Sequence, residues 1–235
     1  MILLLQDMQE VVCSELLCHK SELLREMTVF APADSSPVPV PSFARAEIIH
    51  FIMESLETDN FGLLWKADIQ LLIETFRVTD FLGIEQLTSN LLAVIKDKVT
   101  DSNSFFIFKL VNQLTCFHWI TEHCLDVMMS NINKSYANTV YSASDADPYK
   151  DKYIVMEMHE IHQMLFHTRD TTTVTKILIF RHWWSNNKWS QSHYDVLKFL
   201  EYLNEDASYT PRQHISFMRK IRDQIIDELN LLQNH

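Results

Sequence analysis

The segment DIQLLIETFRVTDFLGIEQLTSNLLAVIKDKV, residues 68–99, gives the clearest indication of the fold. Its clearest apolar stripe comprises Ile84, Leu87, Leu91, Val94 and Ile95. These positions share one helix face at a period of about 3.6 residues. Similar patterns follow one another from residue 43 onward, so the sequence predicts a mostly helical protein.

Composition excludes several enzyme classes. The chain has 235 residues, enough for one large domain or two small ones, and 47% of them are hydrophobic. Its only glycines are Gly62 and Gly83. A Walker loop, a dinucleotide-binding fingerprint and a G-x-S-x-G elbow each need more closely spaced glycines. The net charge of −11 also disfavours general binding to a phosphate backbone.

The first 41 residues carry short, mixed signals. The segments MQEVVC (8–13) and LLC (16–18) are expected to be two strands that meet at Ser14–Glu15. HKSELLREM (19–27) is expected to form a short helix that His19 opens. Val38 and Val40 alternate with prolines, which is typical of an edge strand or an extended segment.

The rest of the chain is expected to consist of helices and one long loop. Ser42 is the expected N-cap of a helix over 43–56. Residues 133–150 are rich in Ser, Asn and Asp and are expected to be the loop. A capping box of Thr210 and Gln213, with Pro211 between them, is expected to open the last helix. The apolar stripes between these points are Ile107, Leu110, Val111 and Leu114; Phe117, Ile120, Cys124, Val127 and Met128; Ile154, Met158, Ile161 and Leu165; Ile177, Phe180 and Trp184; and Val196, Leu200 and Leu203.

The four cysteines form no C-x-x-C pair, and the N-terminal segment lacks the basic start of a signal peptide. No stretch approaches the roughly 20 apolar residues of a membrane span. These features predict reduced cysteines in a cytoplasmic or nuclear protein without a membrane partner.

Clusters of cysteine and histidine suggest metal sites, but none has a suitable spacing. The first is Cys13, Cys18 and His19; the second is Cys116, His118, His123 and Cys124; the third is His159, His162 and His167. The first provides too few ligands for structural zinc, and the second lies along one helix, where its side chains diverge. The third has its first two histidines three residues apart, not four as in H-E-x-x-H. We therefore expect no metal, no cofactor and no catalytic residue.

The segment RHWWSNNKW, residues 181–189, alternates cations with tryptophans, as surfaces that bind single-stranded nucleic acid do. The acidity of the chain and the stripe of Ile177, Phe180 and Trp184 favour core tryptophans with a solvated basic edge. We therefore expect no nucleic-acid partner.

The order of the N-terminal segments resembles the BTB/POZ fold. The signature residues are Asp7 before the first strand and the pair His19–Lys20; further matches are Leu23, Phe51, Ile52, Leu71, Leu72, Phe81, Leu82, Ile84 and Leu87. Residues 103–132 and 174–203 resemble a BACK domain, in which a later helix carries a tryptophan. The resemblance implies an α+β BTB/POZ domain over 1–100, with a small sheet flanked by helices, and an all-α BACK-like domain over 101–235.

This resemblance implies a non-enzymatic homodimer that bridges a cullin-3 RING ubiquitin ligase and a substrate protein. The implied cullin-binding residues are Met27, Val29, Phe30, Phe61, Phe105 and Phe106, and the implied dimer interface is Ile2, Leu3, Leu4 and Leu5. Two departures keep an alternative open. The loop after the His19–Lys20 segment lacks the apolar-x-Glu motif of cullin binders, and only six residues precede Asp7, where dimeric relatives carry a long helix. The alternative is a BTB-BACK scaffold or regulatory dimer that does not bind cullin.

Overall fold

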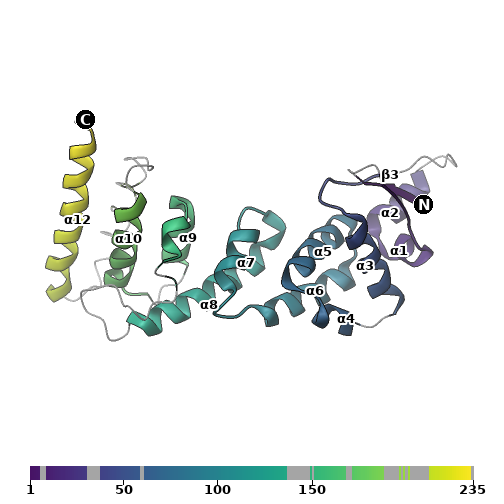
Figure 1. Ribbon diagram of the computed structural model, residues 1–235, viewed down its shortest axis with the longest axis horizontal. Helices are drawn as coiled ribbons and strands as arrows, with labels where there is room; N and C mark the ends of the chain where they lie inside the picture. Colours follow the sequence, from purple (N-terminus) through teal and green to yellow (C-terminus); the bar gives the residue numbers. More distant parts are fainter. Residues whose placement is uncertain are drawn as a thin grey trace. The chain divides into compact units, whose positions relative to one another are not determined.

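The computed structural model describes residues 1–5, 9–30, 38–58, 61–136, 149, 151–167, 171–187, 196, 198, 201 and 212–233 (Figure 1). The chain divides into two compact units. The first comprises Met1–Val99 and Leu114–Ile120, and the second comprises Thr100–Gln113 and Thr121–His235. The sequence places a boundary at residues 100–101 but gives no sign that 114–120 belongs with the first unit.

The described part of the chain is mostly helical with one small sheet, as the sequence predicts. In the sheet, β1 (Ile2–Leu4) lies between β2 (Glu10–Val12) and β3 (Val38–Pro39). Strand β2 runs antiparallel to β1, and β3 runs parallel to it. The predicted edge strand at Val38 is therefore confirmed.

The four N-terminal apolar residues serve this sheet. Leu3 and Leu5 are buried in the first unit, and Ile2 and Leu4 are half-buried. The side chains of Leu3 and Leu5 therefore already have apolar neighbours within their own chain, and only Ile2 and Leu4 retain surface for a second copy. An interface between two copies at this strand stays a prediction.

The prediction of a second strand at residues 16–18 is wrong, because these residues lie in helix α1 (Glu15–Lys20). Ser14 caps this helix, and its hydroxyl accepts a hydrogen bond from the N–H of Leu17 at 3.2 Å. The partner of β2 is instead the N-terminal strand β1. Since β1 (Ile2–Leu4) is the first strand of the chain, the expectation that Asp7 precedes the first strand is wrong. His19 consequently ends a helix and does not open one.

Helix α2 (Glu22–Phe30) follows after the single residue Ser21, which is fully buried. The Ser21 hydroxyl donates to the carbonyl of Leu82 at 2.6 Å and accepts from the N–H of Leu24 at 3.1 Å. The N–H of Glu22 also reaches the carbonyl of Gly83 at 3.4 Å. These bonds fasten the α1–α2 junction to the C-terminal end of helix α5 (Ile69–Leu82).

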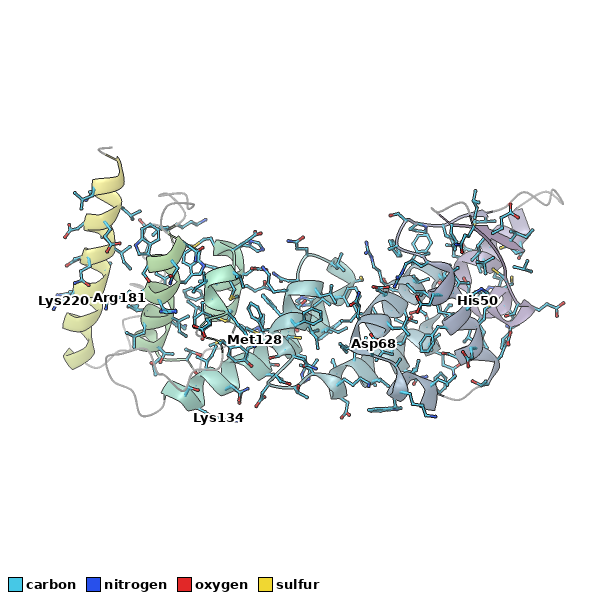
Figure 2. All side chains as sticks on the ribbon, viewed as in Figure 1. His50, Asp68, Met128, Lys134, Arg181 and Lys220 are labelled. Carbon is cyan, nitrogen blue, oxygen red and sulfur yellow. The ribbon has the colours of Figure 1, made fainter. Side chains whose placement is uncertain are left out.

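The helical core of the first unit also contains α3 (Ala46–Glu57), α4 (Gly62–Lys66) and α6 (Glu85–Lys98). Helix α5 packs against both α3 and α6. Asp68, labelled in Figure 2, caps α5 by accepting from the N–H of Leu71 at 2.8 Å. Gly83 ends the helix with a φ of 65°, a conformation that favours glycine.

The predicted stripe along α6 is confirmed, because all five of its residues, from Ile84 to Ile95, are buried. The prediction that Ser42 caps the helix expected over residues 43–56 is wrong. Helix α3 begins at Ala46, after a turn in which the N–H of Ala44 bonds to the carbonyl of Pro41 at 2.9 Å.

The second unit contains α7 (Ser104–Val111), the greater part of α8 (His118–Tyr136), the short 3-10 helix η2 (Tyr153–Val155), α9 (Met158–Phe166), α10 (Thr173–Asn187) and α12 (Arg212–Gln233). Helix α8 begins within the first unit, directly after the 3-10 helix η1 (Thr115–Phe117). In the second unit, α10 packs against η2 and against α12, the last helix labelled in Figure 1.

Two tryptophans of α10 anchor the core of the second unit. Trp183 and Trp184 are buried, and their indole N–H groups donate to the carbonyl of Met156 at 2.9 Å and to a carboxylate oxygen of Glu228 at 3.1 Å. The prediction of core tryptophans is confirmed at these two positions. Their rings are consequently not accessible for stacking on bases.

Several predictions fall partly or wholly on residues that the structure does not describe. These residues are Asp7, most of the loop expected at 133–150, Trp189, Leu200, Leu203 and the Thr210–Pro211 cap. Within the expected loop, α8 continues to Tyr136, so helix replaces loop there.

Candidate protein-interaction surface

Helix α7 carries the most apolar segment among the predicted contact residues. A turn prepares its start, since the side-chain oxygen of Asn103 accepts from the N–H of Thr100 at 2.7 Å. The helix buries Ile107, Phe108 and Val111. These three side chains belong to the core of the second unit, and their burial determines which face of α7 points inward.

The opposite side of α7 stays exposed although it is apolar. The exposed fraction is 53% for Phe106 and 37% for Leu110, which lie one turn apart. The sequence contains a signal for this surface, because SFFIFKLV has apolar residues on every side and a helix at a protein surface buries only one face. Assigning Leu110 to the buried stripe is therefore wrong.

Lys109 connects this helix to the following elements. Its ammonium group donates to both carboxylate oxygens of Glu160 in α9, at 2.8 and 2.6 Å, and to the carbonyl of Val155 in η2 at 3.3 Å. The Glu160 carboxylate also accepts from the N–H of Glu157 at 2.8 Å. This network holds η2 next to α7.

The 3-10 helix η2 adds two exposed apolar side chains. Tyr153 is buried beneath it, whereas the exposed fraction is 40% for Ile154 and 61% for Val155. Asn187 of α10 donates to the carbonyl of Ile154 at 3.2 Å, which fixes the backbone from a second side. We call Phe106, Leu110, Ile154 and Val155 the α7–η2 patch.

Phe105 is half-buried next to Phe106. The Lys152 ammonium lies 5.6 Å from the centre of the Phe105 ring and 5.1 Å from that of Tyr149. The Tyr149 hydroxyl lies 3.0 Å from the hydroxyl of Ser104 and 3.1 Å from the Asp101 carbonyl oxygen. A cation thus lies against the aromatic rings beside the α7–η2 patch.

The other predicted contact residues belong to the first unit. Met27 on α2 and Phe61 before α4 are both half-buried, and the side chains of Val29 and Phe30 lie outside the described residues. Helix α2 packs on α1 and α5, whereas α4 packs on α6. Met27 and Phe61 thus lie on or next to helices that pack mainly on different neighbours.

Three aromatic residues of the first unit are exposed although the sequence gives no sign of their exposure. These are Trp65, Phe81 and Trp119, with exposed fractions of 50%, 42% and 62%. The Lys96 ammonium lies 5.9 Å from the Trp119 ring, and Arg77 lies 4.0 Å from the ring of Phe43, which packs edge-on against Phe81. Aromatic rings beside cations are common in protein interfaces.

The histidines of α9 do not converge on a common point. His162 stacks on Phe166, and His167 lies 2.9 Å from a carboxylate oxygen of Asp126. Among the residues that the structure describes, no group of three or more His, Cys, Asp or Glu side chains could hold a metal ion.

The cysteines are reduced and differ in burial. Burial raises the pKa of the Cys124 thiol to about 12. The pKa of Cys116 is also raised, first by burial and then by the nearby Asp80 carboxylate. Neither has the depressed pKa that marks an activated thiol nucleophile.

Comparison of the chain with protein-family models, curated proteins and solved structures finds no match. Separately, none of the helices in the described ranges is both long and apolar enough to cross a bilayer.

Proposed function

We propose that this chain is a non-catalytic protein-interaction adaptor of the BTB-BACK type, which dimerises and links cullin-3 to a substrate protein destined for ubiquitination. The exposed α7–η2 patch carries the proposal, because four apolar side chains stay exposed on backbone that hydrogen bonds hold in place. Interfaces gain most of their affinity from a few such anchors within a polar rim. An adaptor of this kind acts in the cytoplasm or the nucleus.

The arrangement around Phe106 supports a contact with a protein partner. Its ring is 53% exposed on a helix whose other side is fixed in the core. A fixed backbone lowers the conformational entropy that an anchor residue loses on binding. Of the nearby cations, Lys109 is paired with Glu160 and Lys152 lies over the Phe105 ring. We therefore expect apolar contacts to provide most of the affinity for the partner.

Binding of the purified cullin-3 N-terminal domain to the full chain tests the proposal by calorimetry. We expect micromolar binding and a loss of about tenfold or more in Phe106→Ala, since a hot-spot residue contributes more than about 1.4 kcal/mol. Leu231→Ala is the matched control, because Leu231 is 64% exposed on α12 and lies outside the patch. Equal losses in both variants would refute a specific role for the patch.

The alternative is a scaffold or regulatory dimer that does not bind cullin. The absence of an apolar-x-Glu motif from the sequence between Thr28 and Pro41 favours it. Light scattering separates the two functions when it is combined with the binding measurement. A dimer without cullin binding supports the scaffold, and a 27.7 kDa monomer at micromolar concentration contradicts dimerisation in both cases.

A further inference from the structure

At the N-terminus of α1, cysteines occupy two positions that usually carry a pair of contacting apolar residues. Ser14 is the N-cap, so Cys13 is the residue before the cap and Cys18 is the fourth residue of the helix. In a capped helix these two positions pack against each other and fix the direction in which the chain enters the helix. Here both positions are cysteine.

The contacts around the pair are consistent with this packing. The Cys18 thiol is near enough to contribute to the raised pKa of Cys13. Cys13 is buried, and its N–H donates to the carbonyl of Met1 at 3.0 Å, which extends the pairing of β2 with β1. Cys18 is half-exposed, and its N–H donates to the carbonyl of Ser14 at 3.2 Å. Cys13 is thus buried beside the sheet, and Cys18 is partly exposed.

We propose that Cys13 and Cys18 form a reversible disulfide by exchange with a small disulfide such as oxidised glutathione. The bond would join the end of β2 to α1 and close a short loop containing Ser14 and the first three residues of the helix. This inference is independent of the proposed adaptor function. Because exchange with glutathione makes the bond reversible, a disulfide here fits a redox sensor better than a permanent staple.

The exchange balances in two steps. The Cys18 thiolate attacks one sulfur of oxidised glutathione, forms a mixed disulfide and releases one glutathione thiolate. Cys13 then loses its proton to solvent and attacks the Cys18 sulfur, which releases the second glutathione thiolate. Two protein thiols are oxidised, one glutathione disulfide is reduced, and the two released thiolates take up the two protons.

The order of the steps follows from burial. Burial, with a smaller contribution from the neighbouring Cys18, raises the pKa of Cys13 to about 12. The buried thiol is therefore a poor first nucleophile, and the accessible Cys18 reacts first. Once the mixed disulfide has formed, the adjacency of Cys13 favours the second step.

The experiment equilibrates the full chain in glutathione buffers of increasing oxidation, quenches with acid, alkylates the remaining thiols and digests with trypsin. Cleavage after Lys20 leaves both cysteines in one peptide. We expect this peptide to lose two hydrogens and to escape alkylation, and to recover both reactive thiols after reduction. This measurement uses the unaltered chain, so it does not depend on the folding of any variant.

Variants assign the two roles. In Cys13→Ser, we expect glutathione to remain attached at Cys18, whereas Cys18→Ser should leave Cys13 as a free thiol. Cys124→Ser is the matched control because Cys124 is a buried cysteine of α8, and it should leave the disulfide unchanged. A stable glutathione adduct at Cys18 of the unaltered chain, or no reaction at either residue, would overturn the inference.

Discussion

Lys109 of α7 and Glu160 of α9 form a two-pronged ion pair whose carboxylate is almost completely buried. The exposed fraction is 2% for the Glu160 side chain and 32% for that of Lys109. The two residues are 51 positions apart in sequence, and their pair joins α7 to α9 and supports one side of the α7–η2 patch.

Replacing Lys109 by methionine should destabilise the second unit by about 3 kcal/mol, because a buried carboxylate would lose its counter-charge. Urea unfolding followed by tryptophan fluorescence measures the change. Arg45→Met is the control, since Arg45 pairs with Glu74 at an exposed site and its loss should cost less than about 1 kcal/mol. Similar costs for both substitutions would contradict this description of the Lys109–Glu160 pair.

Gly83→Ala should destabilise the first unit by about 1–2 kcal/mol, because Gly83 has a left-handed backbone conformation that is costly for other residues. An added Cβ would also lie 3.0 Å from the Cβ of Glu22. The free energy of unfolding measures the effect. Gly62→Ala provides the control within helix α4, where the same change should be neutral or stabilise by up to about 1 kcal/mol. The reverse order of stabilities would contradict the prediction.

Phe117→Ala should cost about 3 kcal/mol or more, since Phe117 is fully buried and its ring centre lies 4.9 Å from that of Phe76. The experiment tests whether residues 114–120 are part of the first unit. Trp119→Ala is the control two residues away, because Trp119 is mostly exposed and its removal should change stability by less than about 0.5 kcal/mol. Thermal unfolding by circular dichroism distinguishes these outcomes.

Stability should fall as the pH falls below the ordinary pKa of histidine. Burial, and then the charge of Lys198, lowers the pKa of His162 from 6.5. The unfolded chain therefore binds a proton more readily than the folded chain. The stability that neutral His162 contributes is complete above pH 6.5, and it is lost as the pH falls from 6.5 to the lower pKa of the folded chain.

Urea midpoints between about pH 7.5 and about pH 5.5 measure this dependence. His162→Gln should flatten the curve in this range. His159→Gln is the control on the same helix, because His159 is exposed, and it should leave the curve unchanged. An unchanged slope in His162→Gln would assign the pH dependence to other groups.

The candidate site was only partly predictable from the sequence. Phe106 was identified, but as one of six residues that fall into two units. Ile154 and Leu110 were expected in buried stripes, because periodicity marks apolar faces without showing whether another element covers them. Val155, Trp65 and Trp119 became candidates only when their exposure was known.

Local periodicity and proline restrict the backbone directly, so the helical character, the buried stripe from Ile84 to Ile95 and the edge strand at Val38 are predictable from the amino acids alone. Tertiary structure alone decided that Leu17 lies in a helix, that Ile2–Leu4 pairs with Glu10–Val12, and that Lys109 meets Glu160. The physical reason is that short apolar segments fit either a strand or a helix. The choice between them depends on hydrogen bonds and burial that distant segments of the chain provide.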